Sequence, residues 1–213
     1  MSRFRKLAFG VAILAFGAAP TFAQDKLVPE EGAIEVMLLR QDSVRKELKL
    51  APDVAEKIHK HTDMQWKKAK DVAKLSKDER DKKFAQMTKE NDAFIDATVT
   101  KEQRMRLQQI ELQVVGLLCI TRPAIAKQLK LTDEQMKTAA HMQKEARQEM
   151  EEFLETSKSE KRQEKLAELR KTSRDRLLDL LTAEQEKTWA HLTGTPFKGE
   201  FVFGKTVSKA TSN

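Results

Sequence analysis

Residues 129–135 read Leu-Lys-Leu-Thr-Asp-Glu-Gln, and an earlier stretch, residues 48–53, reads Leu-Lys-Leu-Ala-Pro-Asp, 81 positions before it. A second pair of matching stretches, Val99–Gln103 and Leu181–Gln185, lies 82 positions apart. Hydrophobic positions between these stretches stay in phase at the same spacings. Two blocks in phase predict a duplicated unit of about 80 residues, a size within the range of known helical repeats.

The hydrophobic pattern inside each unit is helical. Leu166, Leu169, Ser173, Leu177 and Leu180 recur every three or four positions, as on one face of an amphipathic helix. No stretch before the C-terminal tail alternates as a strand does. We therefore predict an all-α fold of two tandem repeats, each a short helix, a long helical hairpin and a capped helix. The predicted helices span residues 33–48, 52–74, 77–98, 101–120, 123–130, 133–156, 159–180 and 183–192.

The predicted helix starts carry capping chemistry. In a capping box, a Thr or Ser oxygen accepts from the backbone N–H three residues on, and a Gln or Glu there accepts from the N–H of the first residue. The Thr-x-x-Gln pairs are Thr100 with Gln103, Thr132 with Gln135, and Thr182 with Gln185, and Ser76 with Glu79 is a fourth pair of this kind. Pro52 suits a first helical position, and Gly194 suits a helix C-cap.

The N-terminus has the pattern of a secretory signal peptide. Residues 1–6 are basic, residues 7–19 are uncharged and mostly apolar, and Ala23 provides a small residue for cleavage before Gln24. We divide the chain into a signal peptide (1–23), a first repeat (24–120), a second repeat (121–197) and a flexible tail (198–213). Residues 197–203 are apolar enough to dock on the helical body. No stretch after the leader is apolar enough to cross a membrane.

Charge and cysteine content argue against nucleic-acid binding and against an intrachain disulfide. The formal charge is +7, but residues 1–23 carry three of the 40 basic side chains and none of the 33 acidic ones, which leaves +4 for the rest. Lys and Glu alternate along the helices, and there is no Tyr, so we expect solvated faces and no nucleic-acid binding. The single cysteine, Cys119, follows an apolar run and is predicted to be buried without a disulfide.

No pattern of catalytic or ligand residues stands out. His59 and His61 are two apart and do not share a helical face, and the other two histidines lie far away in sequence. We therefore expect surface histidines, no metal site and no cofactor. Nucleophile elbows and Gly-rich phosphate loops are absent from the sequence, so we expect a protein that is not an enzyme.

One helix carries a stripe of methionines flanked by basic residues. Core packing explains such a stripe, and so does an adaptable surface for clients or partners, since Met fits irregular contacts. The candidate surface comprises Met136, Lys137, Met142, Lys144, Arg147 and Met150. Its basic members would attract acidic clients.

Leu131–Gln135 and Leu181–Gln185 are both Leu-Thr-x-x-Gln. Two such motifs flanking a long hairpin, behind a signal peptide, resemble the LTxxQ family of periplasmic proteins, which includes Spy-like chaperones, CpxP-like stress-response inhibitors and zinc-resistance-associated proteins. The resemblance implies an elongated or cradle-shaped helical bundle, usually of two chains, with a basic and partly apolar face that holds unfolded clients without ATP. Family members carry the motif position twice, whereas this chain has it four times, twice in each predicted repeat. One chain could therefore supply both halves of the bundle, and we expect a monomer with pseudo-two-fold repeats or a homodimer.

Three functions follow as expectations. The first is a periplasmic or secreted Spy-like holdase that binds unfolded or envelope proteins. The second is a structural or regulatory adaptor for one envelope partner. The third is a weak metal-binding stress protein.

The leader yields a direct prediction. The exported protein is expected to begin at Gln24, because Ala23 completes the cleavage site. Mass spectrometry of the exported protein, with N-terminal sequencing, measures this. An exported form that still begins at Met1 would contradict the cleavage.

Overall fold

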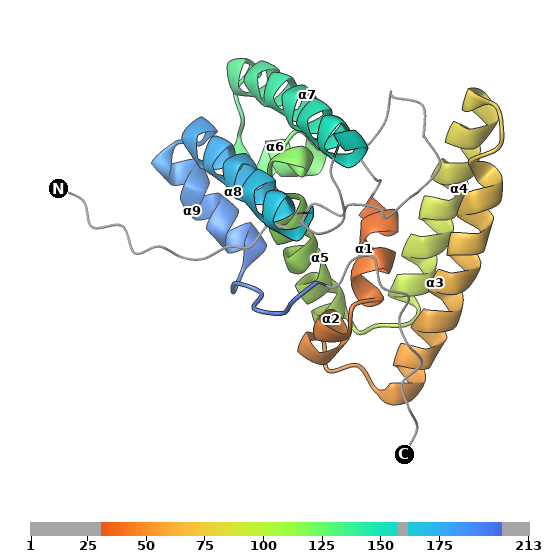
Figure 1. Cartoon of the computed structure of the whole chain (residues 1–213). Coiled ribbons are helices and arrows are strands. Elements are labelled where there is room, and N and C mark those ends of the chain that lie inside the picture. The colour runs from red at the N-terminus through yellow and green to blue at the C-terminus, as the bar shows by residue number, and fades with distance from the viewer. Residues whose placement is uncertain (1–30, 157–161, 202–213) are drawn as a thin grey trace.

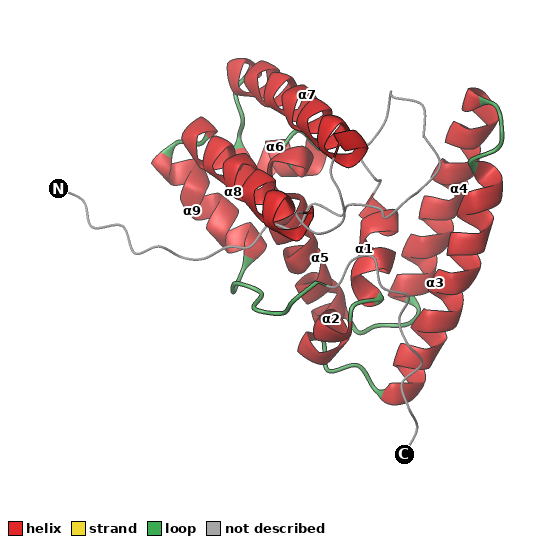
Figure 2. Ribbon diagram, viewed as in Figure 1, coloured by secondary structure: helices red, strands yellow, loops and turns green. Residues whose placement is uncertain are grey.

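The computed structural model describes residues 31–156 and 162–201, and this part of the chain is helical with no strand (Figures 1 and 2), so the all-α prediction is confirmed. The predicted leader, residues 1–23, lies outside the described residues. The elements are α1 (Glu31–Leu39), α2 (Asp42–Glu47), α3 (Pro52–Val72), α4 (Lys77–Asp96), α5 (Lys101–Val115), the 3₁₀ turn η1 (Gly116–Cys119), α6 (Pro123–Leu129), α7 (Asp133–Thr156), α8 (Arg162–Leu180) and α9 (Ala183–Thr193).

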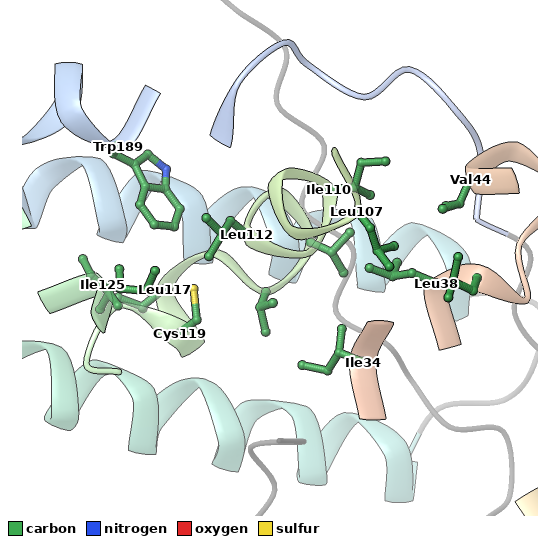
Figure 3. Close-up of a cluster of buried hydrophobic side chains, with 14 of the residues drawn as sticks. Ile34, Leu38, Val44, Leu107, Ile110, Leu112, Leu117, Cys119, Ile125 and Trp189 are labelled. Carbon is green, nitrogen blue, oxygen red and sulfur yellow. The ribbon is translucent and has the colours of Figure 1, made fainter. Parts of the chain in front are cut away.

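Two helical hairpins, α3–α4 and α7–α8, are joined through α5 and η1. Helix α1 lies against α3, α4 and α5, while η1 contacts α7 and α8, and α9 contacts α5 and α6 (Figure 1). The apolar core follows the line of α5 and η1 (Figure 3). Its largest side chains include Leu38 of α1, Leu107 and Ile110 of α5, Leu117 of η1 and Leu129 of α6. Cys119 is buried as predicted, and its Sγ lies 3.0 Å from the carbonyl oxygen of Gly116.

The three Thr-x-x-Gln capping boxes are confirmed. The backbone N–H of Gln103 donates to Thr100 Oγ1 at 3.2 Å, and the N–H of Thr100 donates to Gln103 Oε1 at 2.9 Å. The boxes at Thr132 and Thr182 have the same two bonds. Helix α3 begins at Pro52, and Gly194, whose φ of 63° favours glycine, is the C-cap after the last residue of α9, Thr193, as predicted.

The box at Ser76 is not formed, so that prediction is wrong. The Ser76 hydroxyl donates to Glu79 Oε2 at 2.6 Å and makes no bond to the backbone of α4. The Glu79 carboxylate is a charged and therefore strong acceptor for this hydroxyl, and in this arrangement the Ser76 oxygen does not accept from the backbone N–H of Glu79 as a capping box requires. The start of α4 is therefore capped less completely than those of α5, α7 and α9.

Two predicted helices are interrupted. The predicted helix 33–48 is wrong, because it divides into α1 and α2 at Arg40 and Gln41. On one straight helix Leu39 and Val44 would point about 140° apart, and the break lets both be buried. The predicted helix 101–120 ends early, because Gly116 adopts φ 49°, ψ −121° and the chain continues as the tighter turn η1.

The same C-terminal turn follows α2 and α6. Lys49 and Lys130, 81 positions apart, have φ of 51° and 52° and are the non-glycine residues with positive φ in the described part of the chain. In each turn the following N–H reaches back five residues: Leu50 to the carbonyl of Arg45 at 3.1 Å, and Leu131 to that of Ala126 at 3.0 Å. This is the Schellman arrangement. The turn occurs twice at the predicted spacing, while the duplication itself stays a prediction.

The start of the C-terminal tail docks, as predicted. The buried amide of Gln113 donates to the carbonyls of Thr193 and Thr195 at 2.7 and 2.9 Å and accepts from the N–H of Phe197 at 2.7 Å. Phe197 and Phe201 are partly buried against the core. Residues 202–213, most of the predicted flexible tail, lie outside the described residues.

The capping glutamines also join helices. Gln135 and Gln185 form a reciprocal amide pair, with Nε2-to-Oε1 distances of 2.7 and 2.9 Å. Each Nε2 also reaches the end of another helix: Gln135 bonds the carbonyl of Leu180 at 2.9 Å, and Gln185 that of Lys130 at 3.3 Å. Gln103 does the same to the carbonyl of Leu48 at 2.9 Å. The motif glutamine therefore caps its own helix and clamps a neighbouring helix end.

This pairing predicts an energetic coupling. Gln135→Ala and Gln185→Ala each remove the reciprocal bonds, so the double variant should be less destabilised than the sum by about 1 kcal/mol in free energy of unfolding. Urea denaturation measures the cycle. Gln103→Ala with Gln185→Ala should be additive, because the two side chains bond to different helix ends, at Leu48 and Lys130. Additivity of the first pair would contradict the amide pairing.

Candidate functional site

The candidate surface on α7 is only partly exposed. Lys137 and Lys144 are exposed and lie seven residues apart, on the same side of the helix. Met136 and Arg147 are half-buried, and Met142 is half-buried against the core. Core packing therefore accounts for Met142 better than an open binding surface does. The side chain of Met150 lies outside the described residues.

The seam of the α7–α8 hairpin is polar and small. Its α7 side buries Ala139, Gln143 and Ala146, and α8 buries Ser173 and Leu177. Gln143 Nε2 donates to the carbonyl of Leu117 at 2.9 Å, while Ser173 Oγ is buried with no hydrogen-bond partner among the described residues. Small and polar side chains bury little apolar area, so this seam contributes less to stability than a leucine seam would.

The α3–α4 seam has the same character. Ile58 of α3 and Ile95 of α4 are buried, but Thr62, Gln65 and Asn91 are buried as well. Asn91 Oδ1 lies 3.0 Å from the His61 ring, which stacks on Phe94 at 3.7 Å. Gln65 Nε2 makes a 3.4 Å contact with Glu90, and Gln65 Oε1 has no partner among the described residues. Within the described residues, both hairpins therefore bury polar side chains next to their apolar ones, although Gln143 directs its amide to Leu117 and Thr121 and not to α8.

A buried charge network connects the central elements. Glu35 of α1 is 1% exposed and pairs through Oε2 with Arg104 of α5. Arg104 also reaches Asp96 at 3.2 Å and Asp92 at 3.5 Å, both on α4. One guanidinium therefore joins α1, α4 and α5. Further along α5, buried Glu111 pairs with Arg122 at 2.9 Å, and Arg122 lies just before α6.

Burial controls the ionisation of Glu35. Removal from water raises the pKa of its carboxyl to about 8 from a usual value of 4.5, and this outweighs the attraction of Arg104. The negative charges of Glu111 and Asp92 raise the pKa further. Glu35 is therefore mainly protonated at neutral pH; its Oε2 still accepts from Arg104, and the two aspartates of α4 provide the negative charge near this guanidinium.

These two glutamates were missed by the sequence analysis. Glu35 lies between Ile34 and Val36, and Glu111 is four residues after Leu107 on the apolar stripe of its helix. A carboxylate inside an apolar stripe is the available signal, because such a position is buried when the helix packs. The partners Arg104 and Arg122 are not recognisable in the same way.

The described residues show no arrangement typical of metal chemistry. Within residues 31–156 and 162–201, no three His, Cys, Asp or Glu side chains come together as metal ligands would. The histidines pair locally, His59 with Asp63 at 3.4 Å and His141 with Glu145 at 3.6 Å. A hollow open to solvent lies along α3 between His59 and Asp71, and it is lined by that helix alone.

No single helix in the described part of the chain is long and apolar enough to span a membrane, and one bent pair, Lys101–Cys119 with Pro123–Leu129, meets the length and composition criteria only as a pair.

In comparisons with protein-family models, with curated proteins and with solved structures, nothing matches this chain. The resemblance to the LTxxQ family therefore rests on the motifs alone and stays a prediction.

Glu35 predicts a pH dependence of stability. Its folded pKa lies above the unfolded one, so folding binds a proton, and the free energy of unfolding should fall as pH rises from about 4.5 to about 8. Glu35→Gln removes this titration. Over that pH window its free energy of unfolding should therefore rise relative to that of the parent, by up to about 4 kcal/mol. Chemical denaturation at several pH values measures this.

The exposed Glu134→Gln serves as the control, because it removes one carboxyl outside the network. Its stability curve should keep the slope of the parent. If Glu35→Gln also keeps that slope, Glu35 is ionised in the folded protein and the assignment is wrong.

Proposed function

We propose that this protein is a non-enzymatic helical binding protein of the cell envelope that holds unfolded polypeptides without ATP. The observation that carries the proposal is the polar seam inside each hairpin. The export and the client class come from the leader pattern and the motif resemblance. The structure adds a physical route by which such a chain could present apolar surface.

Helices that share few buried apolar contacts separate at a lower free-energy cost than the rest of a fold. In α3–α4, separation would uncover Ile58, Val72 and Ile95 next to exposed lysines. Unfolded chains offer complementary apolar segments, and the surrounding charges keep the complex soluble. The rest of the core, along α5 and η1, would stay covered by α9 and by the α7–α8 hairpin.

Isolated exposed apolar side chains support the same function. Met64, Met105, Leu75 and Leu178 are 38–58% exposed and lie on different elements, each among charged residues. Flexible methionine side chains adapt to irregular partners. Scattered contacts of this kind suit many weakly bound clients better than one partner of fixed shape.

Tightening the seams should reduce holding activity. Gln65→Leu with Ser173→Ala removes two buried oxygen atoms that have no hydrogen-bond partner, Gln65 Oε1 and Ser173 Oγ, and should raise the free energy of unfolding by about 1–3 kcal/mol even though the 3.4 Å contact of Gln65 with Glu90 is lost. It should also slow amide exchange in both hairpins and weaken the suppression of client aggregation several-fold. Light scattering with three denatured clients of unrelated sequence, together with hydrogen exchange, measures both effects.

The matched control is Gln148→Leu, which makes the same Gln-to-Leu change on the exposed side of α7. It should leave exchange in the seams and client holding near the parent level. Failure of the parent protein to suppress aggregation of any client would contradict the holdase. Capture of one defined envelope protein would then favour the adaptor.

A further inference from the structure

The positive charge of the chain is concentrated at the turn of the α3–α4 hairpin. Residues 67–83, called here the basic tip, carry eight basic and four acidic side chains. Their net charge of +4 equals that of the whole chain beyond residue 23, so the remaining residues sum to zero. These residues are contiguous in the sequence, so the charge excess can be counted there, and the expectation of evenly interspersed Lys and Glu does not hold for this segment.

The charges of the basic tip are displayed outward. Seven of the eight basic side chains are exposed: Lys67, Lys68, Lys70, Lys74, Lys77, Lys82 and Lys83. Lys68 pairs with Glu90 and Lys74 with Asp71, while Lys70 lies 5.8 Å from the centroid of the Trp66 ring. Exposed ion pairs of this kind are weak, so they leave most of the local positive field in place.

The apex of the basic tip is apolar. Leu75 is 38% exposed between Lys74 and Lys77, at the point where the chain turns from α3 into α4. The turn lies at the outer end of the hairpin, away from α5 and α9 (Figure 2). A protruding end of this shape fits a flat surface, whereas a peptide segment would need a groove.

We infer that the basic tip docks the protein on anionic phospholipid membranes, with the lysines among the lipid phosphates and Leu75 at the level of the acyl-chain boundary. Charge complementarity selects this partner. Seven of the eight basic residues are lysines, which act as point charges, and the planar fork of arginine, suited to defined carboxylate partners of a protein, occurs once. A basic cluster beside an exposed apolar residue is the combination that binds at a lipid interface.

The docking surface is the outer end of one hairpin, whereas the seams that carry the proposed function lie along the hairpins' length. Val72 and Leu75 belong to both, so lysine variants that leave these two residues unchanged test the docking apart from the holding of clients.

Vesicle co-sedimentation tests the inference, with the protein in the form that the cell produces and its N-terminus read by mass spectrometry. Binding to vesicles of phosphatidylglycerol and phosphatidylcholine should exceed binding to phosphatidylcholine alone and should weaken with salt. Lys67→Gln, Lys70→Gln, Lys82→Gln and Lys83→Gln together should weaken it at least about tenfold, since each basic side chain near an anionic surface contributes about fivefold. Leu75→Asn alone should weaken it a few-fold.

The control replaces four exposed lysines elsewhere, Lys46, Lys101, Lys127 and Lys187, with glutamine, for the same change in net charge. This variant should bind within a few-fold of the parent. Equal losses in both variants, or no preference for anionic vesicles, would overturn the inference. Binding of the tip to polyglutamate but not to anionic vesicles would overturn it too, and would assign the tip to an acidic polypeptide. Circular dichroism verifies that both variants fold.

Discussion

Every residue from Ile110 to Leu117 is buried, and the rest of the structure depends on this stretch. It covers the end of α5 and the start of η1, where neither helix has a solvent face. Helices α1 and α9 both pack on α5, and η1 contacts both helices of the α7–α8 hairpin. Removing the apolar side chains of this stretch from water is the largest favourable contribution to the fold, since buried apolar area dominates folding free energy.

Burial of this stretch also determines which partners its polar residues need. Glu111 and Gln113 cannot reach water, so each needs a partner inside the protein. Glu111 forms an ion pair with Arg122, which positions the chain just before α6. Gln113 donates to the backbone carbonyls of Thr193 and Thr195, which holds the start of the C-terminal tail. Buried polar groups here specify where distant segments lie.

The seams of the two hairpins differ in composition from the core along α5 and η1. Within the described residues, their seams mix isoleucine or leucine with Thr, Gln, Asn and Ser. Seams of this composition gain less from apolar burial than the stretch along α5 and η1, and the proposed opening of the hairpins rests on that difference. The Thr-x-x-Gln boxes lie at helix starts with exposed threonines, and there Gln135 and Gln185 interlock the starts of α7 and α9. The motif that carries the family resemblance thus explains architecture, and the proposed client recognition has to come from other surfaces.

The sequence by itself determined most of the helices, their caps and the burial of Cys119, because periodicity, Thr-x-x-Gln spacing and Pro or Gly at helix ends act within a few residues. It could not locate the break between α1 and α2, the pairing of Gln135 with Gln185, or the partners of Glu35. Only the tertiary structure decided these, because each depends on which helix faces are covered by segments far away in the chain. The raised pKa of Glu35 is the clearest case: its cause is burial by the other helices.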